Sequence, residues 1–273
     1  MIENKKLHKE AMHVLKLTSR TFYIPINLLE PTLKNTVASA YLCMRAIDEI
    51  EDHEMLDPKT KQALLYATSA LLNNENGFDV VKYRQLLKEY ESILPEVTLR
   101  LGDWIMICPE GIVGKVKEST SIMANGMADW AGKGWYIRSE EELNDYTYYV
   151  AGLVGVMLSD IWKWYDNTET DTDLAIAFGR GLQSVNILRN QQEDHERGVN
   201  FIPDEWELDD MFHYATQNLS LGKKYMKDIN NRNILLFCKI PLALAEKTLK
   251  ALKNGREKIS RKEVETIVGE ITK

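Results

Sequence analysis

The stretch "NTVASAYLCMRAIDEIED", residues 35–52, decides the fold class. Its apolar side chains recur at three- and four-residue spacing, at Val37, Tyr41, Met44 and Ile47, which is the period of one face of an α-helix. Strand signals, which are alternating β-branched runs bounded by Asn-Gly or Asp-Gly, are nearly absent from the whole chain. The pattern therefore predicts an all-α protein.

The distribution of proline favours helices over most of the length. No proline occurs between Gly111 and Ile202, and a proline inside a helix costs about 3 kcal/mol. No linker, low-complexity segment or convincing repeat interrupts the 273 residues, so we predict one domain that spans residues 1–273. The expected helices cover residues 4–18, 32–53, 59–73, 80–93, 95–106, 110–131, 140–164, 170–194, 206–230, 232–253 and 260–271.

Composition and charge exclude some classes of function. Apolar residues make up 44% of the chain and charged residues 27%, which is ordinary for a protein with a buried core. The net charge of −7 is unlike the basic footprint of a nucleic-acid-binding protein. Cys43, Cys108 and Cys238 are widely spaced and odd in number, so we expect free thiols in a reducing compartment.

The sequence also indicates where the protein works. The N-terminal residues lack the continuous apolar core of a signal peptide. The longest apolar run, residues 148–158, is far shorter than the ~20 residues that span a bilayer. We therefore expect a soluble cytoplasmic protein, a monomer or dimer, with loose membrane association left open.

The first cluster of chemically useful side chains ends the stretch quoted above. Asp48 and Asp52 are four residues apart and share a helix face, with Glu51 and Arg45 within one turn of Asp48. Like charges at this spacing repel by a few tenths of a kcal/mol, so a positive charge should lie among them. A solvated acidic helix end is the simpler interpretation, but the apolar "AYLCM" before it indicates a buried helix.

A second polar stripe follows another apolar segment, in "SVNILRNQQED", residues 184–194. Asn186, Asn190 and Asp194 are spaced by four residues, with Glu193 beside them, and an exposed surface face would explain them equally well. Facing the first cluster across a helical bundle, they would form an oxygen-rich cage of the kind that Mg²⁺ prefers. Mg²⁺ held in this way around a diphosphate is what the ionisation of a prenyl diphosphate requires.

Two further segments carry weaker signals. In "LTSRTFYIP", residues 17–25, three hydroxyls surround Arg20, and hydroxyls with a guanidinium can grip a phosphate, although a cap or turn is the common alternative. In "YYVAGLVG", residues 148–155, Tyr149 lies beside Gly152 and Gly155. Tight helix packing explains the glycines, whereas the tyrosine could face a cavity.

In this order, these segments resemble the squalene/phytoene synthase family, and within it the eukaryotic-type squalene synthases. The resemblance runs from the first helix almost to the end of the chain. The matching stretches are "TSRTF", "YLCMRAIDEIED", "NGMADW", "YYVAGLVG", "VNILRNQQED" and "LFCKIPLALAEKTL".

The resemblance implies the isoprenoid-synthase helical bundle, with a central cavity between two aspartate-rich helices. It implies a farnesyl-diphosphate farnesyltransferase that joins two farnesyl diphosphates head to head to give presqualene diphosphate. In squalene synthases this intermediate is ionised and rearranged, and hydride from NADPH completes squalene. We add a peripheral membrane contact for product release as an open expectation.

The resemblance also implies roles for individual residues. The expected Mg²⁺ ligands are Asp48, Glu51 and Asp52 in the first cluster and Asn190, Glu193 and Asp194 in the second. The expected catalytic residues are Tyr149, Arg45 and Tyr41. The expected substrate-binding residues are Ser19, Arg20, Thr21, Phe22 and Gln183. The expected NADPH-binding residues are Asn186, Arg189, Phe237 and Cys238.

Asn190 departs from the family, whose second motif usually begins with aspartate. An amide oxygen can still bind Mg²⁺, but one negative charge is lost, which puts the second ionisation in doubt. The chain could then stop at presqualene diphosphate or act as a terpene synthase or phosphatase on a single prenyl diphosphate. It could also be a non-catalytic relative that binds lipid or serves as an assembly subunit. No glycine-rich dinucleotide fingerprint is present, so NADPH rests on the resemblance alone, and without hydride a dehydrosqualene would form.

Overall fold

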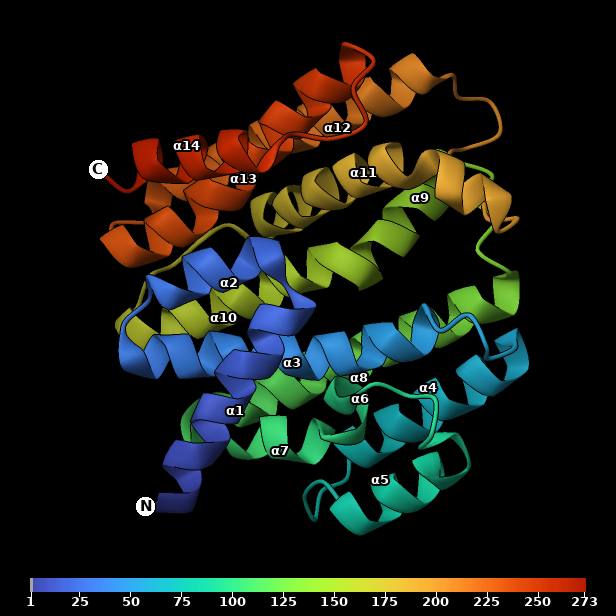
Figure 1. Cartoon of the computed structure of the whole chain (residues 1–273), viewed down its shortest axis with the longest axis vertical. Coiled ribbons are helices and arrows are strands. Elements are labelled where there is room, and N and C mark those ends of the chain that lie inside the picture. The colour runs from blue at the N-terminus through green and yellow to red at the C-terminus, as the bar shows by residue number, and fades with distance from the viewer. Residues whose placement is uncertain (1) are drawn as a thin grey trace. The chain divides into compact units, whose positions relative to one another are not determined.

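The computed structural model describes residues 2–273, with the side chains of residues 5–19 and 21–273. Its contacts divide the chain into two compact units, Met1–Gly134 (unit 1) and Trp135–Lys273 (unit 2) (Figure 1). The described residues form helices and loops without a strand, and one isolated bridge pairs Tyr136 with Asn200. The predicted all-α fold is confirmed, and the single-domain organisation stays a prediction.

Unit 1 holds the long helix α3 that carries the first acidic cluster. This helix packs against α1, α4, α6, α7 and α8, and α4 packs along α8. The helices of the unit are α1 (Ile2–Thr18), α2 (Arg20–Asn27), α3 (Pro31–Glu51), α4 (Pro58–Leu72), α5 (Val80–Leu87), the 3₁₀ turn η1 (Lys88–Tyr90), α6 (Glu96–Leu99), α7 (Leu101–Met106) and α8 (Glu110–Lys133).

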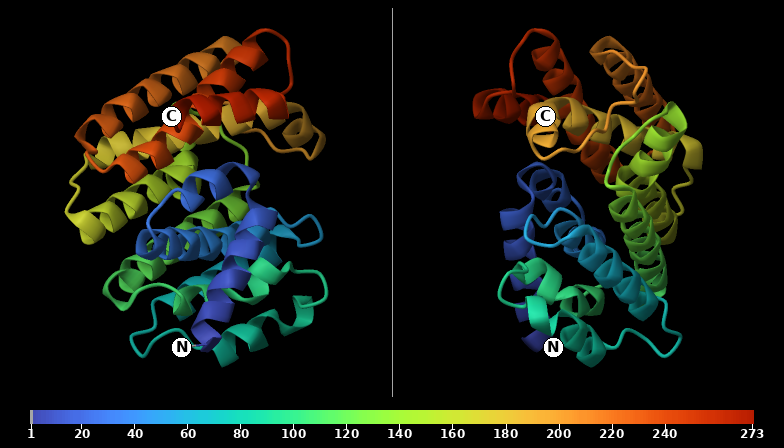
Figure 2. Two further views of the ribbon diagram at one scale, coloured as in Figure 1. Left: turned by 60° about the vertical axis from the view of Figure 1, so that its left-hand side comes forward. Right: turned by 90° about the vertical axis from the view of Figure 1, so that its right-hand side faces the viewer.

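Unit 2 is arranged around α11, which carries the second polar stripe. This helix packs against α12 along much of its length and against α10, α13 and the π-helical turn η2, and α13 and α14 lie side by side in both views of Figure 2. The helices of the unit are α9 (Glu140–Thr147), η2 (Tyr148–Gly152), α10 (Leu153–Asp166), α11 (Thr172–Glu196), α12 (Leu208–Tyr225), the 3₁₀ turn η3 (Met226–Asp228), α13 (Arg232–Lys253) and α14 (Arg261–Ile271).

Buried hydrogen bonds fix α3 within unit 1. The hydroxyl of Ser39 donates to the Trp104 carbonyl at 2.7 Å, and that of Thr98 donates to the Ala46 carbonyl at 3.1 Å. Both hydroxyl residues are fully buried, where an unmade hydrogen bond would cost about 1–3 kcal/mol. The position of α3 against α6 and α7 is therefore specified by polar contacts as well as by apolar packing.

Close backbone contacts at glycines fix α11 within unit 2. A Cβ atom on Gly179 would lie 2.2 Å from the Ala151 carbonyl oxygen of η2, and one on Gly155 would lie 2.3 Å from the Ala175 carbonyl oxygen. Real Cβ contacts are not this short, so only glycine allows this approach of α11 to η2 and α10. The expected tight packing at Gly155 is confirmed.

Three predicted helices are interrupted in the structure. The segment expected as one helix over residues 95–106 divides at Arg100, which leaves helical geometry at φ −108° and binds three carboxylates, those of Glu10, Glu96 and Asp103. The helix expected over 140–164 contains the turn η2, and the one expected over 80–93 ends in η1. Among the described helices, none is both long and apolar enough to cross a membrane.

The contact at Gly179 gives a stability prediction. In Gly179→Ala the new methyl group must displace the Ala151 carbonyl, and overpacking of this kind costs about 1–3 kcal/mol. We expect a lower urea concentration at the unfolding midpoint, measured by circular dichroism.

Gly114→Ala is the matched control, because this exposed glycine lies inside α8 with nothing within 4 Å of the position that the new methyl group would take. Alanine favours a helix over glycine by about 1 kcal/mol, so the control should unfold at a higher urea concentration. A higher urea midpoint for both variants would show that α11 lies farther from η2 than the 2.2 Å contact at Gly179 requires.

Candidate active site

The first acidic cluster lies at the C-terminal end of α3. Oxygen atoms of Asp48, Glu51 and Asp52 all lie within 4.8 Å of one another. Glu51 is buried at 5% exposure, while Asp52 is exposed and caps the helix. The C-terminus of a helix carries a partial negative charge, so these carboxylates oppose both one another and the helix dipole.

Arg45 supplies positive charge one turn before the cluster. Its guanidinium forms an ion pair with Asp48 and donates to Glu49 from Nε at 2.9 Å and Nη2 at 2.6 Å. These two carboxylates raise the pKa of Arg45, although burial of the guanidinium acts in the opposite direction. The predicted proximity of Arg45 to the cluster is therefore seen, with Glu49 as an additional partner.

Asp48 is a carboxylate whose charged form is disfavoured by its surroundings. Burial and the neighbouring charge of Asp52 raise the pKa of the Asp48 carboxyl to about 7, against the opposing effect of Arg45. The side chain of Asp48 is 28% exposed, so it remains open to an ion from solvent. A cation bound beside Asp48 would stabilise the charged form of this carboxylate.

The donor set fits Mg²⁺. All three groups are hard oxygen donors, and Mg²⁺–oxygen distances of about 2.1 Å place two ligands of one ion at most about 4.2 Å apart. The observed limit of 4.8 Å needs only small side-chain rotations to reach that geometry. Over the part of the chain that the structure describes, this is the one group of three or more carboxylate, histidine or cysteine side chains close enough to hold a metal.

Tyr41 extends the same face of α3 toward the start of α2. Its hydroxyl donates to the Thr18 carbonyl at 3.1 Å, and its ring lies 6.2 Å from that of Phe22, centroid to centroid. Burial raises the pKa of Tyr41, which keeps the phenol protonated. Because Tyr41 precedes Arg45 by one helical turn, aromatic, cationic and acidic side chains follow one another along α3.

The predicted diphosphate-binding segment forms the junction of α1 and α2. Ser19 is the N-cap of α2, and its hydroxyl accepts a hydrogen bond from the Phe22 amide at 2.9 Å. Ser19 therefore has the capping role that was the alternative to phosphate binding. Thr21 is exposed. The side chain of Arg20 lies outside the described residues. The substrate-binding role of these residues stays a prediction.

The second polar stripe lies on α11 and is already partly hydrogen-bonded. Arg189 donates from Nε to the Asn190 amide oxygen at 3.1 Å, and Asn186 donates to the Gln183 amide oxygen at 3.3 Å. Glu193 is exposed. The carboxamide and carboxylate groups share one side of α11, as predicted, but their role as metal ligands stays a prediction.

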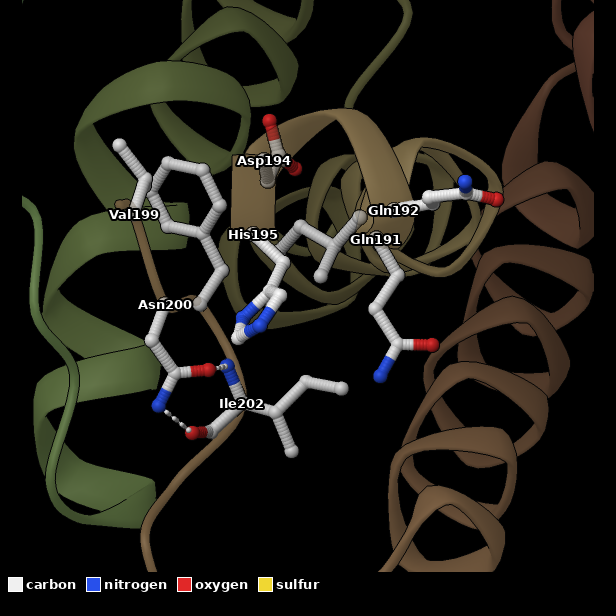
Figure 3. Close-up of a pocket in the computed structure, with 9 residues that line it drawn as sticks. Gln191, Gln192, Asp194, His195, Val199, Asn200 and Ile202 are labelled. Atoms are coloured by element: carbon white, nitrogen blue, oxygen red, sulfur yellow. Dashed lines mark hydrogen bonds between the residues drawn. The ribbon is translucent and has the colours of Figure 1, made fainter. Parts of the chain in front are cut away.

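Asp194 differs from its neighbours because it is buried, at 6% exposure. It forms an ion pair with Arg197, three residues later on the chain. Asp194 also borders a pocket of about 370 Å³ between the end of α11 and residues 199–202 (Figure 3). The lining contains the polar side chains of Gln191 and His195 but no Lys or Arg, so the pocket alone is not suited to a diphosphate.

The predicted catalytic Tyr149 lies in the π-helical turn η2. Its ring meets that of Tyr148 edge-on, with centroids 5.3 Å apart, and it is half-buried. Single π-helical turns within α-helices are frequently found at functional sites. The turn is held by the close contact of Ala151 with Gly179, so Tyr149 is carried by a rigid element.

The two residues expected at the deep apolar end lie inside unit 2. Phe237 is 4% exposed and packs edge-on against Trp162, with ring centroids 5.5 Å apart. Cys238 is 2% exposed, and burial raises the pKa of its thiol to about 12. The thiol is therefore protonated and unreactive, which agrees with the expectation of free, buried cysteines.

Two charged residues of the site were not predicted. Glu49 fixes Arg45, and Arg197 binds Asp194. Each pair has the i,i+4 or i,i+3 spacing at which opposite charges meet on a helix, so the spacing contained the signal. The facing of the two acidic stripes across a central cavity stays a prediction.

Comparison with known proteins identifies the family. The family model of squalene/phytoene synthases matches residues 15–210, which include both polar stripes. The chain belongs to the squalene/phytoene synthase family. The predicted resemblance is confirmed.

Individual members of the squalene/phytoene synthase family match almost the whole chain. The squalene synthase of Dictyostelium discoideum is 29% identical over 288 residues, covering 93% of this chain and 66% of its own length. The squalene synthase of Saccharomyces cerevisiae is 31% identical, covering 90% of this chain and 62% of its own length. The squalene synthase of Homo sapiens is 25% identical, covering 91% of this chain and 64% of its own length. The chain thus spans less than two thirds of these relatives.

Solved structures agree on the fold. TcSQS in complex with the ligand BPH1237 matches with a TM-score of 0.77 at 22% identity, over 98% of this chain and 87% of its own. A dehydrosqualene synthase in complex with ligand matches with a TM-score of 0.65 at 18% identity, over 99% of this chain and 96% of its own. The all-α fold of the isoprenoid synthases is therefore confirmed.

The raised pKa of Asp48 predicts how stability depends on pH without metal. Below about pH 4 the carboxyl is protonated in both the folded and the unfolded chain. Between about pH 4 and the pKa of about 7 that Asp48 has in the folded chain, Asp48 releases its proton in the unfolded chain but keeps it in the folded chain. The free energy of unfolding therefore falls as pH rises through this range. Each pKa unit is worth about 1.4 kcal/mol, and partial exposure of Asp48 reduces the effect to about 1–2 kcal/mol.

The measurement is urea unfolding in EDTA at pH 5 and pH 8. Asp48→Asn should remove most of the decrease, whereas Asp173→Asn, at an exposed carboxylate of unit 2, should retain it. An equal pH dependence in all three proteins would contradict the assignment of the raised pKa to Asp48.

Proposed function

We propose that the chain catalyses the Mg²⁺-dependent head-to-head condensation of two farnesyl diphosphates to presqualene diphosphate, and its conversion to a C30 hydrocarbon. The observation that carries the proposal is the cluster of Asp48, Glu51 and Asp52, with its three converging carboxylates. The squalene synthase names of its relatives support condensation over the single-substrate terpene synthase or phosphatase. The whole activity is proposed because the chain spans less than two thirds of these relatives.

Asp48, Glu51 and Asp52 on α3 would hold Mg²⁺, as would Asn190, Glu193 and Asp194 on α11. When bound, Mg²⁺ neutralises and orients the diphosphate leaving group. The Arg45 guanidinium, already placed between the cluster and Tyr41, would add a planar fork of donors for diphosphate oxygens. Ser19, Arg20 and Thr21 would contribute further donors, and Gln183 would bind the substrate from α11.

Aromatic side chains would protect the carbocation. The rings of Phe22 and Tyr41 lie together and would exclude water, which otherwise traps a carbocation, and their faces attract positive charge. The hydroxyl of Tyr149, held in η2, would assist transfer of the proton released in the first half-reaction to an oxygen of the departing diphosphate.

The use of NADPH is proposed separately, from the accessibility of the residues expected to bind it. Arg189 is exposed and Asn186 is partly exposed, so both are accessible to a dinucleotide. Phe237 and Cys238 are almost fully buried and offer it no surface, so only half of the predicted set fits. We therefore derive no hydride step, and propose squalene as the product if hydride is delivered and a dehydrosqualene-like C30 hydrocarbon if it is not.

The proposed function is tested by incubating the protein with farnesyl diphosphate and Mg²⁺, with and without NADPH. Half of each sample is treated with phosphatase before mass spectrometry. Squalene formed only with NADPH would establish the complete reaction, and a C30 hydrocarbon without NADPH would indicate dehydrosqualene. A C30 alcohol seen only after phosphatase would show that the reaction stops at presqualene diphosphate, and C15 products alone would overturn the proposal.

Asp52→Asn tests the first cluster. Loss of one metal ligand removes several kcal/mol of transition-state stabilisation, so C30 formation should fall by about 100-fold or more, while the circular dichroism spectrum is unchanged. Glu54→Gln is the matched control, because Glu54 is exposed two residues beyond the cluster and is not part of it. Equal activity of the two variants would remove Asp52 from the metal site.

Asn190→Asp tests the second cluster. A restored negative charge should strengthen Mg²⁺ binding, so the Mg²⁺ concentration at half-maximal conversion of presqualene diphosphate should fall by about 3- to 10-fold, as one ionic interaction of about 1 kcal/mol gives. Gln217→Glu adds the same charge at an exposed position of α12 and should leave that concentration unchanged. An unchanged metal requirement in Asn190→Asp would show that the amide is already a competent ligand.

A further inference from the structure

One segment of unit 2 has a charge opposite to that of the rest of the chain. Residues 247–262, "KTLKALKNGREKISRK", contain seven Lys and Arg and one Glu, a net charge of +6. The other residues contain 27 Lys and Arg and 40 Asp and Glu, a net charge of −13. The segment is a concentrated basic region in an acidic protein.

The structure gathers this charge on one surface, the basic patch. Its side chains come from the end of α13, the following loop and the start of α14, and all seven are exposed. The Glu263 carboxylate joins these elements, since it binds Arg256 through both oxygens, at 3.1 and 2.6 Å, and lies 3.8 Å from Lys247. The members of the basic patch are Lys247, Lys250, Lys253, Arg256, Lys258, Arg261 and Lys262.

Acidic neighbours do not neutralise the basic patch. Glu263 is occupied by Arg256, and Glu265 is bound by Arg261 at 3.1 Å. With Glu257, Glu263 and Glu265 all counted, residues 247–265 still carry a net charge of +4. Positive charge therefore remains for an external partner.

Helix stability does not explain the basic patch. Lys250 and Lys253 lie in the last turn of α13, where positive charge is favourable, but Arg261 and Lys262 are the first two residues of α14. The N-terminus of a helix is itself partly positive, so cations there are unfavourable. The i,i+4 ion pair with Glu265 offsets this cost for Arg261, and an anionic partner at this surface would offset it for Lys262.

The side chains around the basic patch fit lipid better than nucleic acid. Residues 247–273 contain no aromatic side chain on which a base could stack. They do contain an apolar stripe along α14, spaced by three and four residues, that α13 only half-covers. Basic side chains beside an amphipathic helix are typical of proteins that lie on an anionic membrane. The stripe consists of Val264, Ile267, Val268 and Ile271.

We propose that the basic patch at the junction of α13 and α14 binds the surface of an anionic lipid bilayer. The inference rests on the proposed function in one respect, namely that a C30 hydrocarbon is nearly insoluble in water and partitions into a membrane. The basic patch would hold unit 2 at the membrane surface into which that product partitions.

The test is flotation of the full chain with lipid vesicles, without substrate. Vesicles of phosphatidylcholine with 30% phosphatidylglycerol should bind the protein at low salt, and pure phosphatidylcholine vesicles should not. Each Lys or Arg at such a surface is worth about fivefold in binding. Lys250→Gln/Lys258→Gln/Lys262→Gln, which leaves the Glu263 and Glu265 ion pairs intact, should therefore weaken binding by up to about 100-fold.

Lys9→Gln/Lys59→Gln/Lys88→Gln is the matched control, because it removes the same charge at exposed lysines of unit 1 and should bind like the unmodified chain. Equal loss in both triple variants, equal binding to neutral vesicles, or tighter binding to a DNA duplex than to anionic vesicles would each overturn the proposal. C30 formation without vesicles is measured separately in the same variants and should be unchanged. A chain that binds anionic vesicles but forms no C30 product would fail the proposed function while retaining the membrane site.

Discussion

Four carboxylates at the C-terminal end of a buried helix are the constraint on which the rest of the site depends. Asp48, Glu49, Glu51 and Asp52 follow one another in the last turn of α3, where the helix dipole is already negative. Arg45 offsets part of this charge by binding Asp48 and Glu49. Burial and the neighbouring charge of Asp52 still raise the pKa of Asp48, and a divalent cation bound there would stabilise its charged form.

Such a cluster can be maintained only on a rigid support. The hydrogen bonds of Ser39 and Thr98 fix α3 from the side of α6 and α7, so repulsion cannot be relieved by moving the helix. In unit 2, the glycine contacts at Gly155 and Gly179 do the same for α11 and for the π-helical turn that carries Tyr149. In each unit, the predicted site residues are carried by helices that are closely packed within that unit.

The sequence predicts the part of this arrangement that depends on periodicity. The long helices α3, α8, α11 and α13 and the clustering of Asp48, Glu51 and Asp52 follow from residue spacing alone. The short helix α2 is not predicted, because Pro25 and the hydroxyls before it favour a turn locally, whereas Ser19 caps a helix that contains the proline. The break at Arg100 and the turn η2 also escape prediction, since each depends on contacts between segments distant in sequence.

The acidic cluster and the basic patch share one feature: each places charge where it is unfavourable to the dipole of its own helix. Carboxylates at the C-terminus of α3 and cations at the N-terminus of α14 each oppose the dipole of their own helix. A chain selected for stability alone would exchange these signs, because each exchange gains about 0.3–1 kcal/mol. In the proposed function and the proposed membrane site, Mg²⁺ with a diphosphate would supply counter-charge at α3, and anionic lipid would supply it at α14. The net charge of −7 averages these two local concentrations of charge, which have opposite signs.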